Sequence, residues 1–124
     1  MVSMNILIIK LGAIGDVVRT TSLIQGLREK YRGCKIDWVT KKSSFDVLKN
    51  NQFIEKIYLI EKASKKLLAK SYDLVVSLDD EHEACELASK IDSKKLIGAY
   101  LENGDRAYTK DSAPWFDMGL ISRF

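Results

Sequence analysis

The sequence contains one proline, one histidine and two cysteines in 124 residues. Cys34 and Cys85 lack a CxxC spacing, and His82 has no second histidine to form a ligand pattern. Zinc takes three or four protein ligands, so two cysteines and one histidine without ligand spacing argue against a metal site. We therefore expect no bound metal and two reduced thiols. Pro114 is the only proline, and no low-complexity linker divides the chain, which indicates a single domain over residues 1–124.

Long apolar runs and a strong net charge are also absent. The first apolar run, Ile6 to Ile9, stops at Lys10, too early for a signal peptide, and no stretch approaches the ~20 apolar residues that span a bilayer. We expect a soluble, cytoplasmic protein. The net charge of +3 is too small to favour nucleic-acid binding. Lysine pairs such as Lys41-Lys42 form either a solvated surface or a basic rim that attracts an anionic ligand.

Short apolar segments alternate with segments of helical periodicity. Strands are expected at residues 5–10, 35–40, 56–60, 72–78 and 95–99. Helices are expected at residues 16–31, 43–50, 63–70 and 81–91. The first helix places four apolar residues on one face, Val17, Ile24, Leu27 and Tyr31. Gly33 follows this helix as its C-terminal cap.

This alternation predicts right-handed βαβ units, and hence an α/β, Rossmann-like parallel sheet with helices on both faces. After residue 99 the pattern changes. Residues 100–113 are polar, with Asn103-Gly104 as a turn, and residues 114–124 are apolar and aromatic. The last segment is either a helix packed on this domain or the beginning of further structure in a larger protein.

The turn after the first strand is the first candidate for chemistry. Parallel sheets bind ligands at the carboxyl ends of their strands, where the strand order reverses. Here that turn reads Lys10-Leu-Gly-Ala-Ile-Gly-Asp16. Gly12 and Gly15 allow close approach of backbone to a ligand, and the following helix points its N–H groups into the same space. The turn matches neither a GxGxxG dinucleotide motif nor a P-loop, so a phosphate cradle is not favoured.

Asp16 has two roles open to it at the start of the helix. Aspartate is a preferred N-cap, and a carboxylate at the edge of a sheet can also act as a general base. The two roles are compatible. Arg19 lies one helical turn further on, where it could pair with Asp16 or meet an anionic substrate. Lys10 ends the strand at the same crevice, and Thr20 adds a hydroxyl.

A second candidate follows the fourth expected strand, where the sequence reads Ser77-Leu-Asp-Asp-Glu-His82. Acidic residues at such a place usually cap a helix and interact with its dipole. This turn also faces the carboxyl edge of the sheet. Asp79 and Asp80 are therefore candidates for ligand contact as well.

The segment from Asn5 to Thr40, NILIIKLGAIGDVVRTTSLIQGLREKYRGCKIDWVT, resembles the opening of family 9 glycosyltransferases, the bacterial heptosyltransferases of lipopolysaccharide core assembly. The resemblance continues more loosely through YDLVVSLDDEHEA, LIGAY and WFDMGLISRF. An apolar strand followed by K-L-G-x-x-G-D and then R-T-T is more specific than a generic pair of glycines.

The resemblance implies the N-terminal, acceptor-binding half of a GT-B architecture. A C-terminal domain, absent from this chain, would bind the nucleotide-sugar donor, typically ADP-heptose. Transfer would invert the anomeric centre without a bound metal. Asp16 would be the catalytic base, and the substrate-binding residues would be Lys10, Gly12, Gly15, Arg19, Thr20 and Asp79. The partners implied are an anionic lipopolysaccharide-core acceptor, the donor and the inner membrane face, and not nucleic acid.

Length is the main departure from this family, because the complete enzymes need a second domain of similar or larger size. Phe124 falls about where the family chain continues, so we expect a truncated N-terminal domain that is inactive alone. The alternative is a stand-alone Rossmann-like module that binds a nucleotide or a sugar without catalysis. A receiver-like signalling domain is disfavoured, because residues 5–10 provide no acidic pocket.

Overall fold

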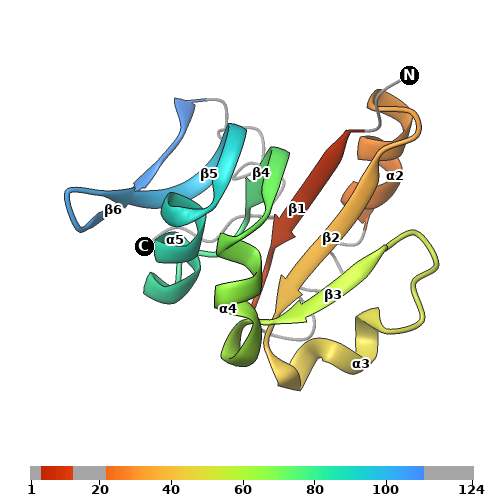
Figure 1. Ribbon diagram of the computed structural model, residues 1–124, viewed down its shortest axis with the longest axis horizontal. Helices are drawn as coiled ribbons and strands as arrows, with labels where there is room; N and C mark the ends of the chain where they lie inside the picture. The colour runs from red at the N-terminus through yellow and green to blue at the C-terminus, as the bar shows by residue number, and fades with distance from the viewer. Residues whose placement is uncertain (1–3, 13–21, 111–124) are drawn as a thin grey trace.

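A single six-stranded sheet organises the molecule (Figure 1). The computed structural model describes residues 4–12 and 22–110. The strands lie in the order β3-β2-β1-β4-β5-β6. The first five strands pair in parallel, and β6 is antiparallel to β5. Their bounds are β1 Asn5–Ile9, β2 Lys35–Thr40, β3 Lys56–Leu59, β4 Ser71–Ser77, β5 Asp92–Glu102 and β6 Asp105–Tyr108.

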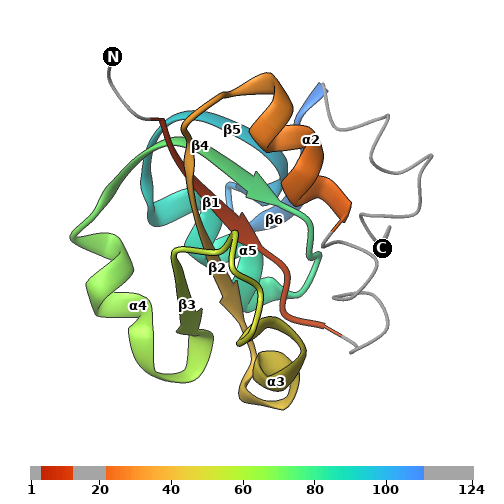
Figure 2. The same cartoon turned by 90° about the vertical axis from the view of Figure 1, so that its right-hand side faces the viewer.

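Helices cover both faces of this sheet, as the turned view shows (Figure 2). On one face, α2 (Ser22–Lys30) and α3 (Phe45–Leu48) pack with Trp38 in one core cluster. On the other, α4 (Ile60–Leu68) and α5 (His82–Lys90) pack in a second cluster. A 3-10 turn, η1 (Lys42–Ser44), precedes α3. β1 serves both cores, because its successive side chains point to opposite faces.

The predicted Rossmann-like α/β fold is confirmed, and most boundaries fall within one or two residues of the expected ones. β2 covers the predicted range, and Gly33 follows α2 with a φ of 78°. α4 begins at Ile60, three residues earlier than expected. Ile60 packs on the same cluster as Ala63 and Leu67, so it belongs to the buried face of the helix. In the sequence it follows the apolar residues of β3 directly, so the apolar pattern assigns it to the strand.

The prediction for the polar segment was incomplete. β5 extends from Asp92 to Glu102, and β6 returns antiparallel beside it. The Asn103-Gly104 turn is confirmed: φ is 53° at Asn103 and 85° at Gly104, the two positive values that a two-residue type I′ hairpin turn requires. β5 carries an apolar run, Leu96 to Leu101, of which the prediction took only the part up to residue 99. β6 has only four residues, two of them charged, so the returning strand left no signal in the sequence. The expected helix start before Ser22 and the apolar tail from Pro114 lie outside the described residues.

Gly98 lies where β5 changes partner, from β4 to β6. Its φ is 113°, and a β-carbon built there would lie 1.9 Å from the Ser77 carbonyl oxygen. The amide of Gly98 donates to Thr109 Oγ1, and its carbonyl accepts from the Thr109 amide. No side chain fits this crossing, so glycine is required for the close approach of the strands.

We expect Gly98→Ala to destabilise the protein by roughly 3 kcal/mol or more, since it combines a backbone clash with an unfavourable φ. Gly26→Ala is the matched control. Gly26 is an exposed helical residue in α2 with open space around its Cα. That substitution should stabilise by about 0.5–1 kcal/mol. Urea unfolding of the three proteins measures both effects, and equal stabilities would contradict the prediction.

A buried polar network ties the amino ends of the strands together. Tyr72 donates its hydroxyl to Asp37 Oδ2 at 2.7 Å, and Lys70 Nζ lies 3.5 Å from the same oxygen. Lys70 also donates to the Tyr58 hydroxyl at 2.8 Å. Burial raises the pKa of Tyr72, and its bond to Asp37 adds to the rise. The network satisfies the carboxylate of Asp37, which is 7% exposed.

Tyr72→Phe should destabilise the protein by roughly 1–3 kcal/mol, because it leaves a buried carboxylate short of a donor. Tyr31→Phe is the control, since Tyr31 packs against the core and its hydroxyl has no hydrogen bond to any residue that the structure describes. Its stability should change by no more than a few tenths of a kcal/mol. Thermal and urea unfolding would distinguish the two variants, and an equal loss in both would refute the role of the network.

Candidate functional site

The carboxyl ends of β1 and β4 meet at the point where the strand order reverses. β1 lies between β2 and β4, and the chain reaches these two neighbours in opposite directions across the sheet (Figure 1). Such a switch point is where open parallel sheets bind ligands. Two segments form it here, Lys10–Gly12 after β1 and Leu78–Glu81 after β4. The described parts of both candidate turns, residues 10–12 and 78–81, therefore lie at one place.

Asp79 joins these two segments. Its Oδ2 accepts hydrogen bonds from the backbone amides of Leu11, at 2.9 Å, and Gly12, at 2.8 Å. Its Oδ1 accepts a third from the amide of Glu81 at 3.0 Å. Asp79 is only 3% exposed. The cap residue of α5 is Glu81, with no side-chain capping bond, so Asp79 acts on the turns and not as the helix cap.

Gly12 has a steric reason to be glycine. A β-carbon built on it would lie 3.3 Å from Asp79 Oδ2, closer than most real contacts of this kind. The amides of Leu11 and Gly12 are consecutive, the arrangement that can bind a phosphate in other proteins. Here both are bonded to a carboxylate of the same chain. A phosphate cradle at these two amides would have to displace Asp79.

Lys10 lies at the same crevice and is 3% exposed. Its ammonium group donates to the Leu78 carbonyl at 3.0 Å, a second tie between the ends of β1 and β4. Its backbone is held as well, because its amide bonds to Val39 and its carbonyl accepts from Trp38 Nε1. The other predicted site residues, Gly15, Asp16, Arg19 and Thr20, lie outside the described residues.

Lys41 belongs to this edge, a more specific position than the solvated surface or basic rim expected for the lysine pairs. It follows β2, and its Nζ lies 2.9 Å from Glu81 Oε1 and 3.8 Å from Glu83 Oε1. The hydrogen bond to Glu81 raises the pKa of Lys41, and the charges of Glu81, Glu83 and Asp79 add to the rise. Its position directly after a parallel strand was the available signal.

Two fully buried hydroxyls end the strands on either side of β1. Thr40 is the last residue of β2 and Ser77 the last of β4. Neither side-chain oxygen has a hydrogen-bond partner within the part of the chain that the structure describes. Together with Lys10 and Asp79, they place four of the six buried polar residues of the described chain at this edge.

Cys85 packs under the second turn, with its Sγ 3.7 Å from the Asp79 carbonyl oxygen. Burial raises the pKa of the Cys85 thiol to about 11, and the nearby charge of Asp80 contributes. His82 points to solvent and lies 3.9 Å from Glu86. Among residues 4–12 and 22–110, no group of three or more histidines, cysteines and acidic residues is arranged to hold a metal ion. In the same ranges, no helix has the length and apolar character to cross a membrane.

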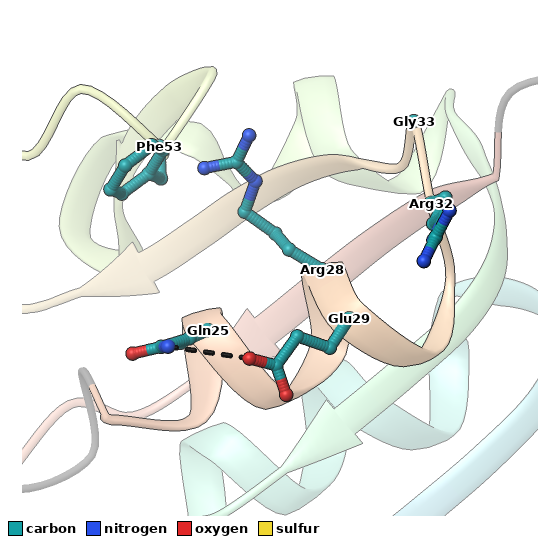
Figure 3. Close-up of a pocket in the computed structure, with 6 residues that line it drawn as sticks. All are labelled: Gln25, Arg28, Glu29, Arg32, Gly33 and Phe53. Carbon is teal, nitrogen blue, oxygen red and sulfur yellow. Dashed lines mark hydrogen bonds between the residues drawn. The ribbon is translucent and has the colours of Figure 1, made fainter.

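A hollow of about 680 Å³ lies elsewhere in the described residues (Figure 3). It is formed by the C-terminal half of α2 and the loop before β3, on the side where the strands begin. The Arg28 guanidinium carbon lies 4.0 Å from the centre of the Phe53 ring, and Gln25 bonds to Glu29 at 3.3 Å. It is therefore separate from the crevice between β1 and β4.

Comparison with curated proteins finds lipopolysaccharide heptosyltransferases. The chain is 22% identical to lipopolysaccharide heptosyltransferase 1 of Campylobacter coli, in a match that covers 88% of this chain. It is 29% identical to lipopolysaccharide heptosyltransferase 3 of Escherichia coli, in a match that covers 82% of this chain. It spans about a third of each relative, 32% in both cases. No family model matches the sequence.

Solved structures show the same fold. A family 9 glycosyl transferase from Veillonella parvula superposes with a TM-score of 0.70 at 20% identity, over 79% of this chain and 33% of that one. The heptosyltransferase WaaC of E. coli, solved with ADP, superposes with a TM-score of 0.66 at 24% identity. The match covers 77% of this chain and 35% of WaaC. These findings confirm the resemblance seen in the sequence and support a fragment of a family 9 glycosyltransferase.

Cys85 should resist alkylation in the folded protein, because it is fully buried and its raised pKa keeps it protonated. Cys34 is the internal control, since it is partly exposed. With iodoacetamide near pH 8, we expect modification of Cys34 well before Cys85, and of both at similar rates in guanidinium. Peptide mass spectrometry measures the two rates. Equal rates in the folded protein would contradict the buried position of Cys85.

Proposed function

We propose that this chain is the N-terminal, acceptor-binding domain of an inverting, metal-independent glycosyltransferase. The enzyme would transfer heptose or a related sugar from a nucleotide-sugar donor to a lipopolysaccharide-core acceptor. The observation that carries the proposal is similarity to two curated lipopolysaccharide heptosyltransferases along more than four fifths of this chain. A donor-binding domain would lie outside the chain, in keeping with the greater length of these relatives.

Asp16 is the catalytic base in this proposal. Its carboxylate would take the proton from the acceptor hydroxyl while that oxygen attacks the anomeric carbon of the donor. The bond from the anomeric carbon to the diphosphate breaks at the same time, and the electron pair leaves with the nucleoside diphosphate. Attack from the opposite side inverts the anomeric centre. The placement of Lys10–Gly12 at the switch point supports this assignment, because Asp16 follows four residues after Gly12.

The remaining residues of the motif would hold the acceptor. Arg19 and Lys10 supply positive charge for a phosphorylated, anionic acceptor, and Thr20 supplies a hydroxyl. Gly12 and Gly15 keep the turn small enough for a sugar to approach. ADP-heptose is the donor we favour, since WaaC, similar in fold to this chain, has been solved with ADP and with ADP-2-deoxy-2-fluoro heptose.

An acceptor anchored in lipid places the reaction at a membrane surface. We therefore propose that the complete protein works in the cytoplasm and associates peripherally with the inner membrane face. The net positive charge of the chain, +3, is compatible with an anionic surface.

The proposal predicts that Asp16→Ala abolishes transfer by the longest reading frame that contains this chain. Loss of a general base costs roughly 10²–10⁴-fold in kcat. The assay follows release of ADP from ADP-heptose in the presence of a heptose-deficient lipopolysaccharide acceptor. Asp46→Ala is the matched control, because the Asp46 side chain is 83% exposed and pairs only with Lys49 in the described structure.

The control variant should keep wild-type turnover. Circular dichroism before the assay shows whether both variants are folded. Near-normal turnover of folded Asp16→Ala would remove Asp16 as the base. A wild-type protein that binds a nucleotide sugar but never transfers it would favour the stand-alone binding module.

A further inference from the structure

We propose that Asp79 is a positioning residue, which sets the geometry of the site through the backbone and does not touch the acceptor. Its carboxylate fixes the turn after β1, and the chain reaches Asp16 four residues later. The catalytic part of this inference rests on the proposed function. The structural part, a carboxylate that holds the two turns together, rests on the described residues alone.

Three hydrogen bonds use most of the accepting capacity of the Asp79 carboxylate. A carboxylate has about four lone-pair sites. Three are used by the amides of Leu11, Gly12 and Glu81, at 2.8–3.0 Å. With 3% of the residue exposed, little of the carboxylate is left to meet a sugar hydroxyl. A substrate contact would require one of these bonds to break.

The partners of Asp79 lie far apart in the sequence. Leu11 is 68 residues away and Gly12 is 67, so the carboxylate links two turns that only the sheet brings together. The strands themselves end just before, at Ile9 and Ser77, with a backbone bond from the Leu78 amide to the Ile9 carbonyl. Beyond this bond, side chains tie the two segments together: Asp79 to the amides and Lys10 to the Leu78 carbonyl.

Gly12 is shaped to this carboxylate. A methyl group at Gly12 would approach Asp79 Oδ2 to 3.3 Å, so the two residues would have to separate by a few tenths of an ångström. Oriented groups in active sites tolerate little displacement, and an error of about 1 Å can cost roughly 100-fold in rate. The pair Asp79 and Gly12 therefore sets the starting point of the segment that carries Asp16.

The first experiment measures amide hydrogen exchange by NMR in the full chain. Asp79→Asn keeps the shape of the side chain but places an NH₂ group where one carboxylate oxygen accepts. We expect the amides of Leu11 and Gly12 to exchange roughly tenfold faster or more, from the loss of charge-assisted bonds. The amide of Ile8, within β1, should change no more than global stability does. Unchanged exchange at Leu11 and Gly12 would overturn the structural part.

The second experiment measures transfer kinetics in the complete protein. A positioning role predicts that Asp79→Asn lowers kcat roughly 10- to 100-fold, with the KM for the acceptor within about twofold. Gly12→Ala, which keeps the carboxylate, should also lower kcat, because the added methyl group pushes against Asp79 Oδ2. The two together should cost less than the sum of their separate free energies, because both disturb one contact. A raised acceptor KM with unchanged kcat would instead make Asp79 a substrate ligand.

Leu87→Ala is the control for stability. Leu87 is buried in α5 and takes no part in the turns, so its truncation destabilises the same face of the sheet. Assayed where all variants are folded, it should keep wild-type kcat. If Leu87→Ala lost as much kcat as Asp79→Asn, the effect of Asp79→Asn would be explained by lost stability alone. That result would overturn the inference. Absence of transfer by the wild-type protein contradicts the proposed function, and the exchange experiment still decides the structural role.

Discussion

The burial of the Asp79 carboxylate is the constraint on which this edge of the molecule depends. A carboxylate removed from water is tolerated only when donors surround it. Here the donors are backbone amides of two turns, so the charge is satisfied only while β1 and β4 are in register. The sheet brings the turns together, and the charge then fixes their geometry. The geometry of the two turns is thus set by contacts within the chain itself.

Asp37 and Asp79, the two buried acids in the part of the chain that the structure describes, are satisfied in two different ways. Asp37, toward the beginning of the strands, is satisfied by the side chains of Tyr72 and Lys70. Asp79, at the opposite edge, is satisfied by backbone amides. Side-chain partners can be exchanged during evolution without moving the chain, whereas backbone partners fix its path. The second arrangement therefore belongs where the path of the chain matters, at the turn that leads to Asp16.

The sequence predicted those features that are local and failed on those set by distant partners. β2 and α5 follow from apolar patterning, and both are confirmed within one residue at each end. The hairpin of β5 and β6 was not predicted, because β6 is short and half charged and only the Asn103-Gly104 turn indicated that the chain reverses. At the site, Lys10, Gly12 and Asp79 could be assigned to one edge of the sheet from the sequence, because they follow parallel strands. The amide partners of Asp79 could not be predicted, since they lie 67 and 68 residues away. The role of Asp16 rests on the family resemblance.

The edges of the sheet have a consequence for how the molecule meets its neighbours. The outermost strands, β3 and β6, are four residues each, the shortest in the sheet. β3 begins with Lys56, and β6 carries Asp105 and Arg106. Short, charged edges offer little unpaired backbone to a strand from another molecule. Association through added strands is thereby discouraged at both edges of the sheet that the structure describes. This leaves the helical faces and the carboxyl end of the sheet, where the two turns lie, as the surfaces better suited to a partner.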